Sequence, residues 1–391
     1  MTGRGEFPGA PVTRVAHAAN ARLVGAADAR ARLLTPALLV EQDVLDANIA
    51  AMQARCDRAG VALRPHAKAH KCVEIARRQL SAGAAGLCVA TPGEAEVFAR
   101  AGLPDLLLTS TFAPGPALEQ LADAATLCRL TLVLDAPQTA RALAAAARAR
   151  GIRIPVLVDL DMGRHRAGAE GRQAVAALAG VIAEEESLVL GGLQAYAGHL
   201  SHQADARQRS LGAQEAAARI HAAREALSPF MGDIRPAVTG GSTGAFVQEL
   251  ATGVYTEFQC GSYALMDVEY DLVDPDGSGR PAFPASLSVA VRVTSANAPG
   301  LATTDGGEKR FAAKHGTAPR IMRGAPAGAS YRPSSDEHGT VTLPEGARLS
   351  PGDLIELEVP HCDPTVNLYD FIHVMQGDKL VAIWSVDARG A

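Results

Sequence analysis

Short apolar runs alternate with longer amphipathic stretches over most of the chain. The apolar runs have the length of strands, and the stretches between them carry apolar residues at helical spacing over about 10 to 15 residues. The runs are PALLVEQ, GLCVAT, DLLLTST, LTLVLD, IPVLVDLDMG and LGGLQAYAGHL. Alternating strands and helices build a parallel sheet, and seven or eight such units in about 235 residues favour a (β/α)8 TIM barrel over an open doubly wound sheet.

The pattern changes after residue 272. The stretches ASLSVAVRVTSANA, GTVTLPEG, DLIELEVP and KLVAIWSV are typical of short strands, and Gly, Pro and Asp separate them. The sequence therefore predicts an α/β chain with a barrel over residues 35–272 and a smaller β-rich domain over residues 273–391. We expect residues 1–34 to pack with the β-rich domain.

Composition excludes several classes of protein. A formal charge of −5 over 391 residues gives no case for a nucleic-acid partner. The longest apolar runs fall short of the roughly 20 residues of a membrane-spanning helix, and charges interrupt residues 1–34, so we expect a cytoplasmic protein without a membrane partner. Reduced, mostly buried thiols fit the six scattered cysteines better than disulfides or a zinc ribbon. The six are Cys56, Cys72, Cys88, Cys128, Cys260 and Cys362.

Unusual polar residues cluster directly after the apolar runs. Since the active sites of TIM barrels lie at the carboxyl ends of the strands, these clusters should converge on one site. The clusters are Lys68; Asp159, Asp161, Arg164, His165 and Arg166; Tyr196, His199 and His202; residues 239–244; and residues 259–263.

Two of these clusters suggest a cofactor. The run LRPHAKAHK (63–71) is either a solvated basic face or the surroundings of a reactive amine at Lys68. The run TGGSTG (239–244) is either a structural turn or a phosphate site, because its glycines expose backbone N–H groups beside the hydroxyls of Ser242 and Thr243. Its place after the last strands favours the phosphate. A phosphate site and a lysine at one barrel mouth together suggest pyridoxal 5'-phosphate, whose aldehyde needs an amine.

Seven motifs carry a resemblance to a known family. They are RPHAKAHK, LDMGRHRAG, LQAYAGHLSH, TGGSTG, GVYTEFQCGSYALMD, SSDEHGTV and HCDPTVNLYD. In this order, from about Thr35 to the C-terminus, they resemble the D-threonine aldolases and D-serine dehydratase-like enzymes of alanine racemase (fold type III) architecture. The resemblance implies an N-terminal pyridoxal phosphate barrel, a C-terminal β-domain, and a homodimer with its active site at the domain and subunit junction.

The resemblance also assigns roles to residues. It makes Lys68 the Schiff-base lysine, with His66 and Arg64 shaping its pocket, and it places Arg166 and Tyr196 around the cofactor ring. Two loops would hold the phosphate. Their residues are Gly241, Ser242, Thr243, Gly244, Gly261, Ser262 and Tyr263.

The run HCDPTVN offers a metal site. His361 and Asp363, two residues apart, could share one divalent ion on one side of an extended segment, although an H-x-D in a loop is also common as hydrogen-bonded structure. By the resemblance, aldolases carry H-x-D here and dehydratases H-x-C. Imidazole and carboxylate ligands suit Mn²⁺, Mg²⁺ or Ca²⁺ better than Zn²⁺. Cys362 occupies the middle position and would point away.

These observations predict retro-aldol cleavage of D-3-hydroxy-α-amino acids to glycine and an aldehyde, with His202 as the base aligned with the family's catalytic histidine. His199 is either functional or merely packed. Dehydration of D-serine or 3-hydroxyaspartate is the main alternative. A racemase would need two bases and no metal, and a non-catalytic pyridoxal phosphate carrier would need neither the second domain nor its ligand pair.

Overall fold

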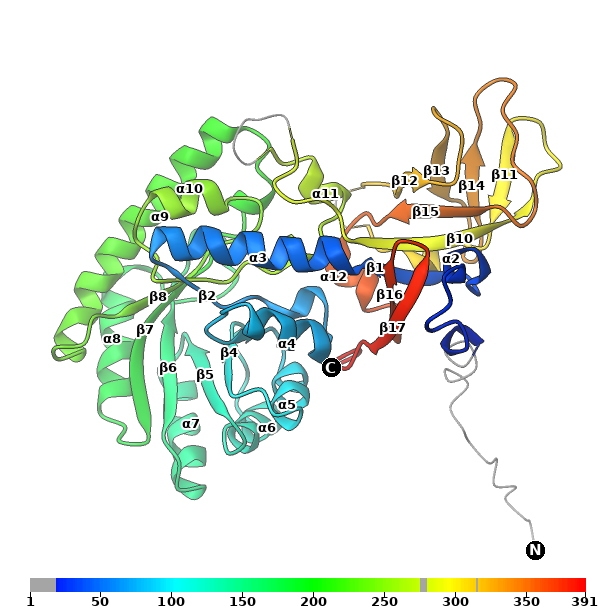
Figure 1. Cartoon of the computed structure of the whole chain (residues 1–391). Helices are drawn as coiled ribbons and strands as arrows, with labels where there is room; N and C mark the ends of the chain where they lie inside the picture. Colours follow the sequence, from blue (N-terminus) through cyan, green and yellow to red (C-terminus); the bar gives the residue numbers. More distant parts are fainter. Residues whose placement is uncertain (1–18, 275–279, 314–315) are drawn as a thin grey trace, which may run out of the picture.

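The computed structural model describes residues 19–274, 280–313 and 316–391, and within them a barrel packs against a second, β-rich body (Figure 1). Eight parallel strands form one sheet in the order β2-β9-β8-β7-β6-β5-β4-β3. A parallel bridge between His66 and Cys88 joins β2 to β3 and closes the sheet. The predicted TIM barrel is confirmed. The strands are β2 (Ala62–Leu63), β3 (Leu87–Val89), β4 (Asp105–Leu108), β5 (Arg129–Leu134), β6 (Ile154–Asp159), β7 (Leu188–Ala195), β8 (Ala237–Gly240) and β9 (Glu257–Phe258).

Helices form the outer layer of the barrel (Figure 1). Proline occupies the first turn of α5, α6 and α7, where its missing N–H removes no helical hydrogen bond. α3 ends at Gly60, whose φ of 65° suits a left-handed cap. The helices are α3 (Gln42–Ala59), α4 (Val73–Ser81), α5 (Pro92–Arg100), α6 (Pro116–Ala124), α7 (Pro137–Ala149), α8 (Gly171–Ala183), α9 (Ala206–Leu227) and α10 (Phe246–Ala251).

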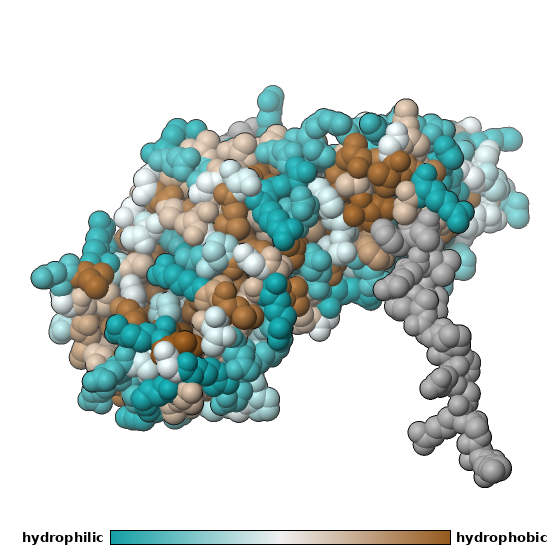
Figure 2. Space-filling model, turned by 60° about the horizontal axis from the view of Figure 1, so that its bottom comes forward, coloured by the Kyte–Doolittle hydropathy of each residue, from teal (hydrophilic) through white to brown (hydrophobic). Residues whose placement is uncertain are grey.

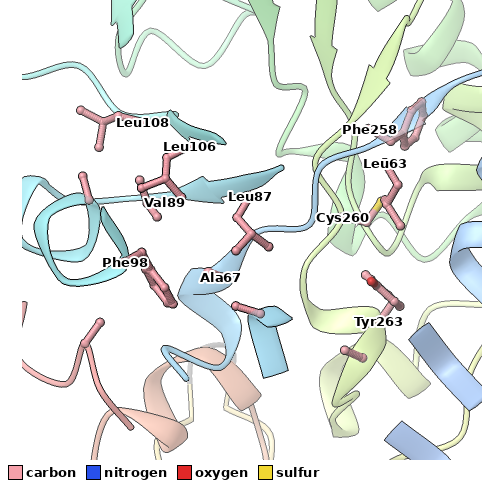
Figure 3. Close-up of a cluster of buried hydrophobic side chains, with 14 of the residues drawn as sticks. Leu63, Ala67, Leu87, Val89, Phe98, Leu106, Leu108, Phe258, Cys260 and Tyr263 are labelled. Atoms are coloured by element: carbon pink, nitrogen blue, oxygen red, sulfur yellow. The ribbon is translucent and has the colours of Figure 1, made fainter. Parts of the chain in front are cut away.

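Apolar side chains fill both faces of the barrel strands. Leu106 and Leu108 join the core shared with the helices, and Phe98 of α5 packs in the same cluster (Figure 3). Leu107 between them belongs to a separate cluster with Cys88, Val133 and Leu157. Because successive side chains on a strand point to opposite faces, continuous apolar runs such as Leu106–Leu108 are what a sheet buried on both sides requires.

A mixed nine-stranded sheet forms the second body, and the predicted strand PALLVEQ belongs to it. β1 (Ala37–Glu41) pairs antiparallel with β10 and parallel with β16 instead of opening the barrel. The remaining strands are β10 (Leu287–Ser295), β11 (Leu301–Thr304), β12 (Arg320–Arg323), β13 (Ser330–Pro333), β14 (Gly339–Thr342), β15 (Leu354–Glu358), β16 (Phe371–Gln376) and β17 (Lys379–Ser385). The predicted β-rich C-terminal domain is present.

Residues 19–34 lie against this sheet. In α2 (Ala29–Arg32), the buried guanidinium of Arg30 bonds the carboxylates of Glu41 and Glu356. Leu23 and Leu33 pack with Leu39 and neighbouring apolar residues. We also expected residues 1–18 to pack with this domain, but they lie outside the described residues.

The surface in Figure 2 mixes hydrophilic and hydrophobic side chains over both bodies. Among the helices of the described ranges, none combines the length and the apolar character that crossing a membrane would require.

Candidate active site

Lys68 lies on a short helical turn where the first barrel strand ends. The turn is η1 (Ala67–Ala69), and its two alanines are fully buried while Lys68 is partly exposed. The buried His66 precedes it. Its Nδ1 accepts the N–H of Lys68 at 3.4 Å, and its Nε2 lies 2.9 Å from Oγ1 of Thr109, which donates to the carbonyl of Val89. His66 Nε2 therefore carries the proton, and burial, then the charge of Lys68, lowers its pKa well below the usual range.

The other charges of LRPHAKAHK are not a solvated face. Arg64 donates to Asp105 at 2.7 Å and to Glu257 at 2.9 Å. These carboxylates belong to the first residues of β4 and β9, so Arg64 lies toward the opposite end of the barrel and does not shape the Lys68 pocket as expected. Lys71 pairs with the buried Glu94 at 3.2 Å.

One cavity brings most of the predicted cofactor residues together. It opens between the carboxyl ends of the barrel strands, as TIM barrel sites do. The predicted residues that line it are His66, Lys68, Arg166, Tyr196, Gly241, Ser242, Thr243, Gly261 and Ser262. The guanidinium carbon of Arg166 lies 5.8 Å from the ring centroid of Tyr196, so the two form one wall. Gly244 and Tyr263 are buried but do not line the cavity.

The two glycine loops leave no room for side chains. A Cβ on Gly241, whose φ is 86°, would lie 2.5 Å from the ring of Phe258, and one on Gly261 would lie 2.6 Å from the carbonyl of His66. A Cβ on Gly244 would lie 1.9 Å from the carbonyl of Ser201.

The first glycine loop also carries two buried hydroxyl groups, those of Ser242 and Thr243. Within the described part of the chain, the buried hydroxyl of Ser242 has no hydrogen-bond partner, while Thr243 accepts the N–H of Tyr263 at 3.2 Å. A tight backbone turn with an unused hydroxyl fits the phosphate of pyridoxal phosphate.

Glu249 supports the same loop from behind. It lies on α10 and its Oε2 accepts the N–H of Ser242 at 2.9 Å. Burial raises its pKa to about 8, although the hydrogen bond from the N–H of Ser242 acts in the opposite direction. At neutral pH Glu249 is therefore largely uncharged, which avoids placing a carboxylate charge behind a phosphate site.

Asp363 connects the second domain to this cavity. It lies in α12 (Cys362–Val366), and its Oδ2 is 3.4 Å from Lys68 Nζ. Its Oδ1 accepts the hydroxyl of Ser262 at 3.2 Å. Burial alone would raise the pKa of Asp363, but Lys68 and then His361 hold it well below the usual range. Burial, the largest single effect, would likewise lower the pKa of Lys68, but Asp363 and the neighbouring groups together outweigh it, so that pKa is raised.

His361 lies at the start of α12 beside two buried carboxylates. Its Nδ1 is 2.9 Å from Oδ2 of Asp267 and 3.8 Å from Oε2 of Glu269. Ligand atoms of Asp267, His361 and Cys362 all lie within 4.8 Å of one another. Buried carboxylates around an imidazole suit a divalent cation. Asp363 is not part of this group of three, so the pair His361 and Asp363 stays a prediction.

His202 and His361 come together, although 159 positions separate them in the sequence. His202 ends the turn η2 (Leu200–His202), and its ring centroid lies 6.3 Å from that of His361. Oε2 of Glu269 lies 4.0 Å from Nδ1 of His202. His199 is exposed, and it is absent from the cavity lining. Burial, then Arg164 and Arg219, lowers its pKa.

Sequence reasoning missed several residues of the site. Thr109, Gln194, Gln259 and Tyr270 line the cavity, and Asp267 and Glu269 lie behind it. The stretch GSYALMDVEYD carried a signal, because acidic residues follow the second glycine loop at once. Asp267 caps α11 (Val268–Asp271) and thereby aims this segment at His361.

Two family models match the chain in the order that the motifs indicated. "Alanine racemase, N-terminal domain" matches residues 40–268, and "Putative serine dehydratase domain" matches residues 286–375. The chain belongs to this fold type III family of pyridoxal phosphate proteins. The resemblance inferred from the motifs is thus confirmed.

Relatives extend the match over nearly the whole chain. A D-threonine aldolase from Arthrobacter sp is 38% identical over 93% of this chain and 94% of its own length. A 3-hydroxy-D-aspartate aldolase from Paracoccus denitrificans (strain Pd 1222) is 33% identical over 91% and 92%. A solved D-threonine aldolase from Filomicrobium marinum superposes with a TM-score of 0.87 at 33% identity, over 92% of this chain and 96% of its own.

Proposed function

We propose that the protein is a pyridoxal phosphate- and divalent-metal-dependent lyase that cleaves D-3-hydroxy-α-amino acids to glycine and an aldehyde. The observation that carries this proposal is the approach of Asp363 to within 3.4 Å of Lys68, with His361 two residues before it. Imidazole and carboxylate donors beside a cofactor lysine can hold a hard cation where a substrate hydroxyl would lie. The aldolase activities named for two relatives support the same reaction.

In this proposal the barrel holds the cofactor. Lys68 binds its aldehyde, Arg166 and Tyr196 flank its ring, and the two glycine loops hold its phosphate. When bound, pyridoxal phosphate supplies a sink for the electrons of a bond to Cα. His66 keeps Lys68 in place through the main chain and adds no positive charge, because its imidazole stays neutral.

In this proposal, residues of the second domain and His202 activate and deprotonate the substrate hydroxyl. His361 and Asp363 would hold a divalent ion, which would supply Lewis acidity to a nearby hydroxyl. His202, whose Nδ1 lies 4.0 Å from Oε2 of Glu269, takes the hydroxyl proton. The carboxylate of Glu269 stabilises the resulting imidazolium. Cleavage of the Cα–Cβ bond then gives the aldehyde, and protonation of Cα gives glycine.

Dehydration of D-serine or 3-hydroxyaspartate is the second candidate. The match of residues 286–375 to a serine dehydratase domain and the presence of Cys362 in the buried group favour it. Lys68 would then take the Cα proton, and the hydroxyl would leave. A racemase or a carrier would make no use of a buried carboxylate and imidazole cluster next to the lysine. We further propose that the active form is a homodimer acting on small D-amino acids.

The test is formation of glycine and acetaldehyde from D-threonine by the holoenzyme with Mn²⁺. We expect activity in the wild type and in Glu345→Gln, which changes an exposed glutamate remote from the site. Lys68→Ala, Asp363→Ala and a chelator should each abolish it. Full activity after metal removal would refute the metal-dependent reaction.

A further inference from the structure

Asp267 joins the segment after the second glycine loop to the segment that carries His361. Its side chain is fully buried. Oδ1 accepts the N–H of Tyr270 at 2.9 Å, and Oδ2 accepts the N–H of Cys362 at 2.8 Å. The same Oδ2 lies 2.9 Å from Nδ1 of His361. One carboxylate therefore holds two main-chain segments and one imidazole.

These contacts fix the tautomer of His361. A carboxylate is an acceptor only, so Nδ1 of His361 must carry the proton of the 2.9 Å hydrogen bond. In the neutral ring the lone pair is then on Nε2. Histidines that bind metals through one ring nitrogen commonly donate the other N–H to a carboxylate, which orients the ring and makes the ligand more basic.

Asp267 is better placed to orient a ligand than to be one. Its two oxygens already accept three hydrogen bonds, and two of these come from main-chain N–H groups. An ion on Oδ2 and Nδ1 would break the bond to His361 and compete with the N–H of Cys362. The thiol of Cys362 donates to Oδ1 of Asp363 at 3.3 Å, so it too is engaged.

We propose that Asp267 is the positioning residue of the metal site, holding His361 so that Nε2 is the nitrogen that binds the divalent ion. The inference rests on the proposed function, since it takes His361 as a metal ligand. It adds Asp267 to the predicted pair of His361 and Asp363, and it specifies which ring nitrogen of His361 binds the ion.

Glu269 provides a matched control. Its Oε2 lies 3.8 Å from the same Nδ1, beyond hydrogen-bond distance, and it is buried like Asp267. Glu269→Gln and Asp267→Asn each remove one carboxylate charge next to His361. Only the second disturbs a hydrogen bond to the ring, because an asparagine side chain has one acceptor oxygen for the three donors around Asp267.

The experiment is a Mn²⁺ titration of metal-depleted holoenzyme followed by electron paramagnetic resonance. We expect Asp267→Asn to weaken Mn²⁺ binding by about 10- to 100-fold, and Glu269→Gln by no more than about threefold. Adding Asp267→Asn to His361→Ala should cause no further loss. Saturating Mn²⁺ should restore turnover in Asp267→Asn, and the cofactor absorbance should match the wild type, which separates positioning from a folding defect.

Three outcomes would contradict the account in different ways. Unchanged Mn²⁺ affinity in Asp267→Asn overturns this inference and leaves the proposed function intact. A further loss in the double variant makes Asp267 a direct ligand, which also overturns it. Unchanged affinity in His361→Ala removes the metal site of the proposed function itself.

A measurement on the wild type covers the case in which Asp267→Asn does not fold. The ¹⁵N chemical shifts of His361, assigned by comparison with His361→Ala in Mg²⁺-loaded enzyme, report which ring nitrogen is protonated. A protonated Nδ1 supports the proposal, and a protonated Nε2 overturns it.

Discussion

Oδ2 of Asp363, in the C-terminal domain, lies 3.4 Å from Nζ of Lys68, at the mouth of the barrel. The residues are 295 positions apart in the sequence, and neither domain alone contains both. The ion pair places a buried carboxylate of the second domain next to the amine of the cofactor cavity. Asp363 therefore brings the second domain to the cavity, at the junction of the two domains.

Asp363→Ala should remove both a proposed metal ligand and the partner of Lys68. A Lewis acid contributes several kcal/mol to such a reaction, so we expect glycine formation from D-threonine to fall by about 100-fold or more. Mn²⁺ affinity, measured on the same preparation, should fall as well. If Asp363→Ala lost activity with Mn²⁺ affinity intact, Asp363 would serve Lys68 and not the metal.

His202 and His199 make a matched pair of histidines three residues apart. Because His202 lies beside His361 and Glu269, His202→Ala should lower kcat by about 10²- to 10⁴-fold, the range for loss of a general base. His199 is exposed and lies outside the cavity lining, so His199→Ala should keep kcat within about threefold. Steady-state kinetics with D-threonine measures both. Equal losses in the two variants would remove His202 as the specific base.

The sequence was most informative where glycine, lysine and histidine occur in unusual runs. LDMGRHRAG follows β6, TGGSTG and LQAYAGHLSH begin in the last residues of β8 and β7, and the closure of eight parallel strands brings these strand ends together. The rhythm of apolar runs was therefore enough to predict the barrel and the end of the barrel at which this cavity lies.

Substituting Gly244 tests how closely the proposed phosphate loop is packed, and Gly180, in helix α8, serves as the control position. A Cβ on Gly244 would meet the carbonyl of Ser201 at 1.9 Å, whereas one on Gly180 of α8 would meet Phe230 at an ordinary 3.5 Å. Gly244→Ala should shift the loop and weaken pyridoxal phosphate binding by about tenfold or more, equivalent to about 1.4 kcal/mol. Gly180→Ala should bind the cofactor normally and gain about 0.5–1 kcal/mol of stability. Fluorescence titration of apoenzyme with pyridoxal phosphate reports the first effect, and thermal unfolding the second.

Similar cofactor affinities in Gly244→Ala and Gly180→Ala would show that the loop around Ser242 accommodates a side chain. Close backbone approach would then not be what forms the proposed phosphate site.

Glu249 should make stability depend on pH. Burial raises its pKa in the folded chain to about 8, from a usual value of 4.5. Between these pH values the folded state retains a proton that the unfolded state releases, so Glu249 contributes stability below pH 4.5 that is lost as pH rises to about 8. The melting temperature of the wild type should therefore fall relative to that of Glu249→Gln from pH 5 to pH 8.

Because each melting temperature is compared with that of Glu249→Gln at the same pH, other titrating groups cancel. Glu345→Gln should track the wild type, since Glu345 is exposed. A constant difference between the wild type and Glu249→Gln across this range would show that Glu249 is ionised in the fold.

Contacts between segments that are distant in the sequence could not be predicted from the sequence alone. The run PALLVEQ has the composition of a strand in either domain, and only its pairing with β10 and β16 places β1 in the second sheet. Arg64 occurs two residues before His66, yet its partners Asp105 and Glu257 draw it to the other end of the barrel. No sequence pattern singled out Asp267, and its proposed role in positioning His361 is inferred only from its hydrogen bonds.

The most direct test of the account is product analysis with three substrates. Holoenzyme with Mn²⁺ is incubated separately with D-threonine, D-serine and D-3-hydroxyaspartate, and glycine and ammonia are quantified in each reaction. The account predicts glycine and an equimolar aldehyde, with ammonia at background. Ammonia with an equimolar keto acid, and no glycine, would contradict it and would show that an aspartate at position 363 does not select carbon–carbon cleavage over dehydration.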